Sequence, residues 1–255
     1  MFQNISMRKL LLVSTLLFFS LSLIAGASVE LVFSGGMWSL NLVKGRIESL
    51  ANDQIDNAIR DTIENDYPEL RDASYMHTVN FDSSGGNYGL GLRIYPGGKK
   101  GSFSLGVFLF KTSMTLEMDG TIRIEKEGNY GIVNGQGKVN INTPALLLEL
   151  RWEFLPSSLI SPYITFGGGA GYLNGDAAFN GDIETHVGGT VEYDTISESK
   201  TFDQLREEEE NVPSVLPFAK LVLGVRARLT DNLNAFIEGG LLNGFVFSGG
   251  AGFRF

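Results

Sequence analysis

The nine residues from Leu146 to Phe154, Leu-Leu-Leu-Glu-Leu-Arg-Trp-Glu-Phe, alternate between two kinds of position. Every even position is apolar, and the odd positions carry Glu149, Arg151 and Glu153 after Leu147. Because successive side chains of a β-strand point to opposite faces, this order collects the charges on one face and the apolar bulk on the other. An α-helix would scatter the three charges around its axis. The stretch therefore predicts an amphipathic β-strand long enough to cross a bilayer when tilted.

The same alternation recurs along the chain, most clearly from Pro217 to Leu229 and from Gly244 to Phe255. Together with weaker examples it predicts eight strands. Their expected ranges are Val29 to Leu40, Tyr88 to Tyr95, Phe103 to Met118, Val139 to Phe154, Tyr163 to Leu173, Pro217 to Leu229, Asn234 to Leu241 and Gly244 to Phe255.

The segments between these strands alternate in length. Three are short turns, three are long loops, and the last connection is only Leu242-Asn243. Short turns at one end and long loops at the other are typical of outer-membrane barrels. The expected turns are 96–101, 155–161 and 230–233, and the expected loops are 41–80, 119–138 and 174–214.

A soluble antiparallel barrel also alternates, but its apolar face points inward. Here the polar face is rich in glycine and serine, which suits a crowded lumen, and the glycine clusters at 167–171 and 89–91 are expected as small lumen or kink positions. The apolar face is expected to carry an aromatic girdle near the strand ends, which favours lipid outside. The girdle residues are Trp38, Trp152, Phe154, Tyr172, Phe253 and Phe255.

The N-terminus has the order of a secretory signal peptide. Arg8 and Lys9 precede an apolar run from Leu10 to Ile24, and Ala25-Gly26-Ala27 forms a small-residue cleavage site. We therefore expect residues 1–27 to be a Sec signal peptide and residues 28–255 to be the barrel domain. The alternative is an uncleaved membrane anchor, for which the run is short.

Composition excludes several classes of function. The chain has 255 residues, with 20 basic and 29 acidic side chains and a formal net charge of −9. This acidity argues against nucleic acid as a partner, because nucleic-acid binding needs basic surface. No cysteine is present, so disulfides, cysteine-ligated metals and a cysteine nucleophile are excluded.

With its eight alternating segments, its Leu229-Thr-Asp-Asn-Leu233 turn and its ending Gly252-Phe-Arg-Phe255, the sequence resembles the small outer-membrane barrels of the OmpA-barrel, OmpX and OmpW-like kind. The resemblance covers about residues 28–255 and implies a bacterial outer-membrane location and contact with outer-membrane lipid. A terminal Phe after alternating aromatics looks like the signal read by the barrel-assembly machinery. The chain departs from these proteins in its long first and third loops, and it lacks the C-terminal peptidoglycan-binding domain of some relatives.

The first long loop contains apolar residues at helical spacing, including Ile47, Ala51, Ile55 and Ile59, which predicts an amphipathic helix over Lys44 to Asn65. Its apolar stripe must pack somewhere. It either lies on the hairpin extensions of its own loop, or forms a lid on the barrel mouth or a helix that binds a partner. The acidic run from Glu207 to Glu210 is expected to be a solvated helix end.

The search for catalytic chemistry finds little. His77 and His186 are the only two histidines and so the only candidate bases at physiological pH, and neither has a serine or aspartate pattern that would create a nucleophile. Thr185-His186 beside Asp182 and Glu184 is the one segment that could suggest an enzyme. We expect no catalytic residue, no cofactor and no metal site.

Two functions remain open: a structural or surface-interaction barrel with a closed lumen, or a narrow channel or transporter for small solutes, apolar ones included. If the alternation is read correctly, ten charged residues point into a bore that side chains can fill. Charges removed from water are costly unless they are paired, so we expect a salt-bridge network in the lumen. Its residues would be Glu30, Arg93, Glu149, Arg151, Glu153, Lys220, Arg226, Arg228, Glu238 and Arg254.

Overall fold

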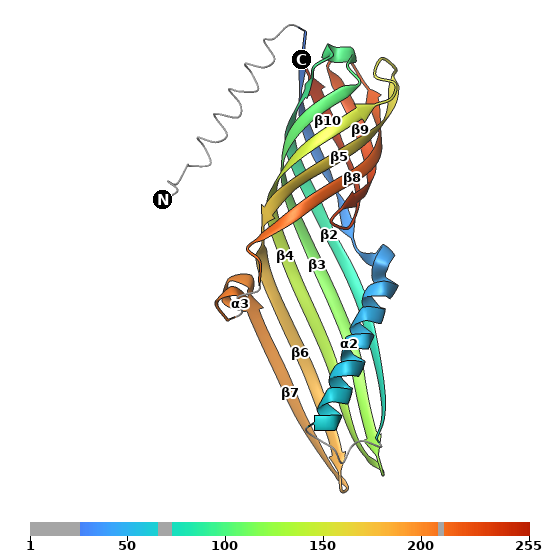
Figure 1. Ribbon diagram of the computed structural model, residues 1–255, viewed down its shortest axis with the longest axis vertical. Helices are drawn as coiled ribbons and strands as arrows, with labels where there is room; N and C mark the ends of the chain where they lie inside the picture. The colour runs from blue at the N-terminus through green and yellow to red at the C-terminus, as the bar shows by residue number, and fades with distance from the viewer. Residues whose placement is uncertain (1–25, 66–72, 209–211) are drawn as a thin grey trace.

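The computed structural model describes residues 26–65, 73–208 and 212–255 (Figure 1). The predicted signal peptide up to Ala25 lies outside these residues, as do Glu209 and Glu210 of the acidic run. Among the described residues, no helix is both long and apolar enough to span a membrane. The elements are β1 (Ser28–Ser39), η1 (Asn41–Val43), α2 (Lys44–Asn65), β2 (Ser74–Tyr95), η3 (Gly98–Lys100), β3 (Phe103–Lys126), β4 (Asn129–Glu153), β5 (Ile160–Tyr172), β6 (Asn174–Val187), β7 (Thr190–Thr201), α3 (Phe202–Glu208), β8 (Val215–Arg228), β9 (Leu233–Leu242) and β10 (Phe245–Arg254).

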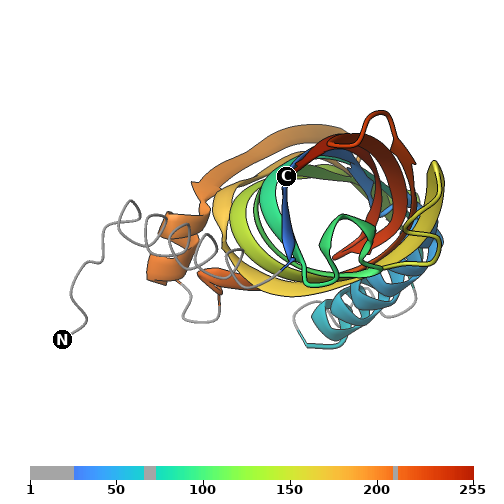
Figure 2. The ribbon, with the colours of Figure 1, turned by 90° about the horizontal axis from the view of Figure 1, so that it is seen from above.

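Eight of the strands close into an antiparallel barrel, seen from above in Figure 2. The order around the ring is β3-β2-β1-β10-β9-β8-β5-β4, and the pairing of β3 with β4 closes it. The first strand therefore lies beside the last, with Glu30 opposite Arg254. This confirms the predicted eight-stranded barrel, in which every edge strand is paired.

Beyond the ring, β2, β3 and β4 continue as a curved sheet to which β6 and β7 are added (Figure 1). We call this sheet, residues 74–85, 114–142 and 174–201, the extension. β4 pairs with β5 over Ala145–Glu153 and then changes partner to β6 over Asn142–Tyr130. The predicted loop at 119–138 and most of that at 174–214 are thus wrong: they are strands, and pairing keeps their backbone groups hydrogen-bonded.

The amphipathic pattern reverses where the barrel ends and the extension begins. On β3 the outward side chains Leu105 and Leu109 are exposed on the barrel, but further along the same face Glu117 and Asp119 follow. The inward side chains change in the opposite sense, from polar ones in the lumen to Val79 and other apolar ones on the concave face of the extension. The barrel therefore has an apolar outside, whereas the extension has the polar outside and apolar inside of a sheet in water.

Helix α2 spans Lys44–Asn65, the predicted range, and lies along the extension (Figure 1). The Glu48 carboxylate accepts a hydrogen bond of 2.9 Å from the Phe81 backbone N–H, and Asp56 lies 3.5 Å from the His77 ring. Of the two arrangements left open by the sequence, the structure has the first, in which the helix packs on the strands of its own loop. The barrel mouth is not its packing surface.

The turn η1, which precedes α2, is held to β2 by several hydrogen bonds, and the Asn41 side chain makes three of them. The side-chain oxygen Oδ1 of Asn41 accepts hydrogen bonds from the Ser83 backbone N–H at 2.9 Å and from the Ser83 hydroxyl at 2.8 Å. The Asn41 amide donates to Asp82 at 2.6 Å. These contacts fix the corner at which the chain leaves the barrel wall.

Replacing Asn41 by alanine is expected to loosen this corner and to leave the Ser83 N–H without its partner. A net loss of about 1 kcal/mol per hydrogen bond would speed amide exchange at Ser83 by roughly tenfold. Hydrogen exchange read by mass spectrometry over 81–85 measures it. Asn57→Ala, a change at an exposed position of α2, is the control, and equal exchange in the two variants would contradict the anchoring role.

One member of the predicted aromatic girdle is misplaced. Trp38 is 3% exposed, and its indole N–H donates a hydrogen bond of 3.1 Å to the Leu242 carbonyl oxygen. The reason is parity: Trp38 is an even number of residues from Glu30 on β1, so both face inward. The other predicted girdle residues are exposed on the outer surface: Trp152, Phe154, Tyr172, Phe253 and Phe255.

Candidate functional site

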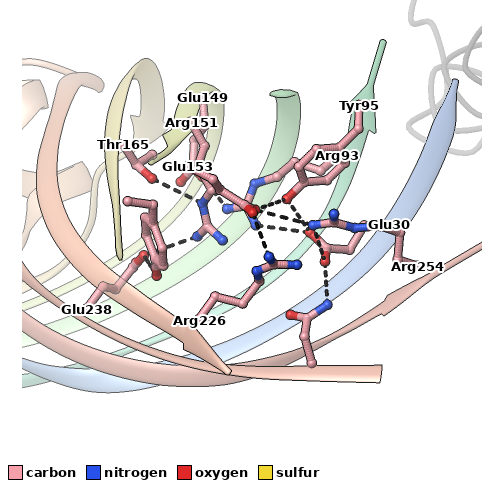
Figure 3. A network of polar contacts seen from close by, with 12 residues as sticks. Glu30, Arg93, Tyr95, Glu149, Arg151, Glu153, Thr165, Arg226, Glu238 and Arg254 are labelled. Atoms are coloured by element: carbon pink, nitrogen blue, oxygen red, sulfur yellow. Dashed lines mark hydrogen bonds and ion pairs between the residues drawn. The ribbon is translucent and has the colours of Figure 1, made fainter. Parts of the chain in front are cut away.

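The lumen holds a network of charged side chains at the end of the barrel that carries the short turns (Figure 3). Nine of the ten residues expected there are between 0% and 6% exposed, so they are removed from bulk water. They come from six strands of the ring: Glu30, Arg93, Glu149, Arg151, Glu153, Lys220, Arg226, Glu238 and Arg254.

Glu30 is the centre of the part nearest the short turns. It lies between Arg93 on β2 and Arg254 on β10, because it is in register with both. Arg254 contacts Glu30 and Glu153 at 3.3 Å each, and Arg93 reaches Glu30 at 3.5 Å. The Tyr95 hydroxyl lies 3.0 Å from a carboxylate oxygen of Glu30 and from one of Glu153. Each buried carboxylate therefore has both a cation and a neutral donor.

Glu149 and Glu238 organise the deeper part of the network. Lys220 donates to both carboxylates at 2.8 Å, and Arg93 donates to Glu149 at 2.9 Å. Arg151 lies 3.4 Å from Glu238 Oε2, and the Tyr163 hydroxyl donates a hydrogen bond of 2.9 Å to the same oxygen. Since Arg93 contacts both Glu30 and Glu149, the two parts form one continuous network.

Three of these contacts pass over a glycine on the strand between the two partners. Gly106 is in register with Arg93 on one side and Glu149 on the other, and Gly167 is likewise between Glu149 and Lys220. A Cβ at Gly106 would lie 2.9 Å from Arg93 Cγ, and one at Gly224 would lie 2.3 Å from the Tyr163 ring. The lumen glycines therefore let long polar side chains lie flat on the wall and meet across it.

Aromatic rings support the guanidinium groups. Arg254 lies 3.5 Å from the centre of the Tyr95 ring and Arg151 lies 3.7 Å from that of Tyr163, both cation–π distances. Such stacking stabilises buried cations and leaves their N–H groups available as hydrogen-bond donors. The inward set of four glutamates and five basic residues is thus nearly neutral.

Arg228 does not join this network. It is only partly buried at the rim, where it donates a hydrogen bond of 2.7 Å to the Pro156 carbonyl oxygen. It has the strand parity of Arg226, but strand β8 ends at this residue, so its side chain reaches a turn instead of a carboxylate.

Beneath the charged layer, toward the extension, the lumen is filled by apolar side chains. Leu147 is 0% exposed, and Phe108, Val222 and Val32 are 1% exposed. Sequence reasoning missed this layer, because its residues occupy inward positions on the same strand face that carries the charges. Its residues are Val32, Phe108, Phe110, Ala145, Leu147, Tyr163, Phe218, Val222, Phe236, Leu242 and Val246.

Sequence reasoning also missed the neutral donors of the network. Tyr95 follows Arg93 at the same parity, Tyr163 is inward on β5, and Asn234 donates a hydrogen bond of 2.6 Å to Glu30. All three would have been found if every residue at an inward strand position had been considered, and not the charged residues alone.

The two histidines lie on the extension and not in the lumen network: His77 is on β2 and His186 is on β6. The His186 ring stacks on Tyr130 at 5.1 Å, and its Nδ1 lies 3.3 Å from the Gly128 carbonyl oxygen. The Tyr130 hydroxyl donates to Glu184 at 2.8 Å, which raises the pKa of Tyr130. Among the described residues, no group of three acidic or histidine side chains is arranged to hold a metal ion.

Comparison with known proteins gives only remote similarity. No protein-family model matches the chain, and no curated protein matches it. Among solved structures, the N-terminal β-barrel domain of Pseudomonas aeruginosa OprF is similar at 14% identity and a TM-score of 0.28, covering 89% of this chain and 97% of that one. The translocator domain of the autotransporter NalP from Neisseria meningitidis is similar at 12% identity and a TM-score of 0.22, covering 96% and 95%. The assignment of this chain to the eight-stranded antiparallel barrels rests on its own strand pairing, which closes the ring.

Proposed function

We propose that the protein is a non-enzymatic barrel of the bacterial outer membrane whose lumen is closed and whose extension serves a structural or surface-interaction role. The apolar outer band of the barrel supports contact with lipid, and the polar outer face of the extension supports its projection into water. In the same proposal, residues 1–27 are a Sec signal peptide and the barrel-assembly machinery inserts the mature chain.

The filling of the bore by buried side chains is the observation that carries this proposal. The charged network occupies one level of the bore and the apolar layer the next, and both consist of side chains that are nearly inaccessible to water. An eight-stranded barrel is just wide enough for its side chains to fill. An ion would have to break paired contacts at the first level and shed its water at the second.

Single-channel recording of the refolded protein in planar bilayers tests the closed lumen. We expect no steady conductance from the unmodified chain. Arg151→Ala should admit brief openings and lower the urea midpoint of unfolding, because it removes the guanidinium stacked on Tyr163 and one partner of Glu238. Arg123→Ala, which breaks a half-exposed pair with Glu125 on the extension, is the matched control. Large, steady conductance of the unmodified chain would reject the closed lumen.

A narrow transporter for small apolar solutes is the second candidate, and one observation favours it. A groove of about 210 Å³ lies between α2 and the concave face of the extension. Ile55 of the helix lines it together with Val79, Met118, Ile122 and Phe179 of the sheet. Binding of a small apolar dye that Phe179→Ser abolishes, with uptake into vesicles that carry the protein, would support this function over the first.

A further inference from the structure

A pocket of about 190 Å³ lies at the short-turn end of the barrel, beside the lumen network and separate from the extension. Its lining is strongly basic, with a single acid, Asp231. In a chain of net charge −9 this is a local reversal of sign, which attracts anions. The five cations that line it are Lys99, Lys100, Arg226, Arg228 and Arg254.

Three of these cations have no carboxylate partner among the described residues: Lys99, Lys100 and Arg228. Lys99 donates to the Asn232 side chain at 2.6 Å and Arg228 to the Pro156 carbonyl oxygen at 2.7 Å, so both contact only neutral groups. Elsewhere in the molecule Lys220 and Arg93 each contact two carboxylates. Uncompensated positive charge is therefore concentrated in this pocket.

The two arginines at the inner wall of the pocket also keep unused donors. Arg226 and Arg254 are 2% and 3% exposed, and the Nε of each has no hydrogen-bond partner among the described residues. A buried donor without a partner costs free energy that a ligand can recover. The wall is fixed, because Arg226 is paired with Glu153 at 2.9 Å and Arg254 with Glu30.

We propose that this pocket is a binding site for a phosphate group. Arginine forks and lysine ammonium groups are the protein donors best matched to phosphate oxygens, and the volume admits the group with a few waters. Leu233, which also lines the pocket, is 37% exposed and continues into the apolar outer band, so the pocket lies at the level where lipid headgroups would be. The proposal does not depend on whether the lumen conducts.

Calorimetric titration of the full mature chain in a nonionic detergent tests the site with three ligands: inorganic phosphate, water-soluble dihexanoyl phosphatidic acid, and acetate as the ligand control. The double variant Lys100→Gln with Arg228→Gln should lower phosphate affinity by at least about tenfold, since it removes two charged donors. Lys111→Gln, at an exposed lysine on the outer face of β3, removes one positive charge away from the pocket and should leave affinity unaltered. Within the described part of the chain neither Lys100 nor Arg228 has an ion pair, so the urea midpoint should move little, and a midpoint close to that of the unmodified chain excludes a folding defect.

Binding of both phosphate ligands would assign recognition to the phosphate group itself, whereas binding of phosphatidic acid alone would assign it to a lipid headgroup. Either supports the site if the double variant weakens it. The proposal is overturned if neither ligand binds, if acetate binds as tightly as phosphate, or if the double variant binds as well as Lys111→Gln.

Discussion

Glu149→Gln is expected to lower the free energy of unfolding by about 3–5 kcal/mol, because it leaves two buried cations with one carboxylate each instead of two and so puts uncompensated positive charge in the lumen. Glu149 is 2% exposed and contacts both Arg93 at 2.9 Å and Lys220 at 2.8 Å. Glutamine keeps the shape of the side chain, so the loss reports charge and not packing. Urea unfolding of the refolded protein in bilayers, followed by tryptophan fluorescence, measures it.

Glu117→Gln provides the matched control on the extension. Glu117 forms an ion pair with Lys138 at 2.7 Å, but both side chains are about half exposed, at 51% each. An exposed pair of this kind contributes about 0–1 kcal/mol. If the two variants unfold at the same urea concentration, the lumen charges are hydrated and the closed lumen is wrong.

Leu148→Arg is expected to destabilise the protein by about 2–4 kcal/mol, the cost of a lipid-facing arginine near the bilayer midplane. Leu148 is 62% exposed in the middle of the outer face of β4, between Leu146 and Leu150. In water the same exposed change would be nearly neutral. Urea unfolding in bilayers measures the cost, and repeating it in short-chain detergent should reduce the cost.

Gln136→Arg is the control for this second experiment, because it lies on the same strand and the same face but on the extension. It should change the free energy of unfolding by less than about 0.5 kcal/mol. Equal costs at the two positions would contradict the assignment of the membrane boundary to the point where the strand pattern reverses.

The strands of the extension were predictable in part from the sequence. Thr121, Ile122, Arg123 and Ile124 alternate as regularly as a barrel strand does, but with the apolar residues at the other parity. A strand whose outward residues are polar resembles a loop when the sequence is searched only for strands with an apolar outward face. The reversed alternation belongs to a strand whose outer face is polar, as in a sheet that meets water on that side. In β6 and β7 the pattern is weaker, because glycines and acids interrupt it.

By itself, the sequence determined the barrel wall, the helix over Lys44–Asn65 and the side of the wall to which each charge points, because a strand's side chains alternate strictly. It could not determine which charges meet. Arg93 reaches Glu149 only because the register places Gly106 between them, and Lys220 reaches it only over Gly167. Register and shear depend on every strand of the closed ring at once. The pairing of the lumen charges was therefore decided by the tertiary structure alone.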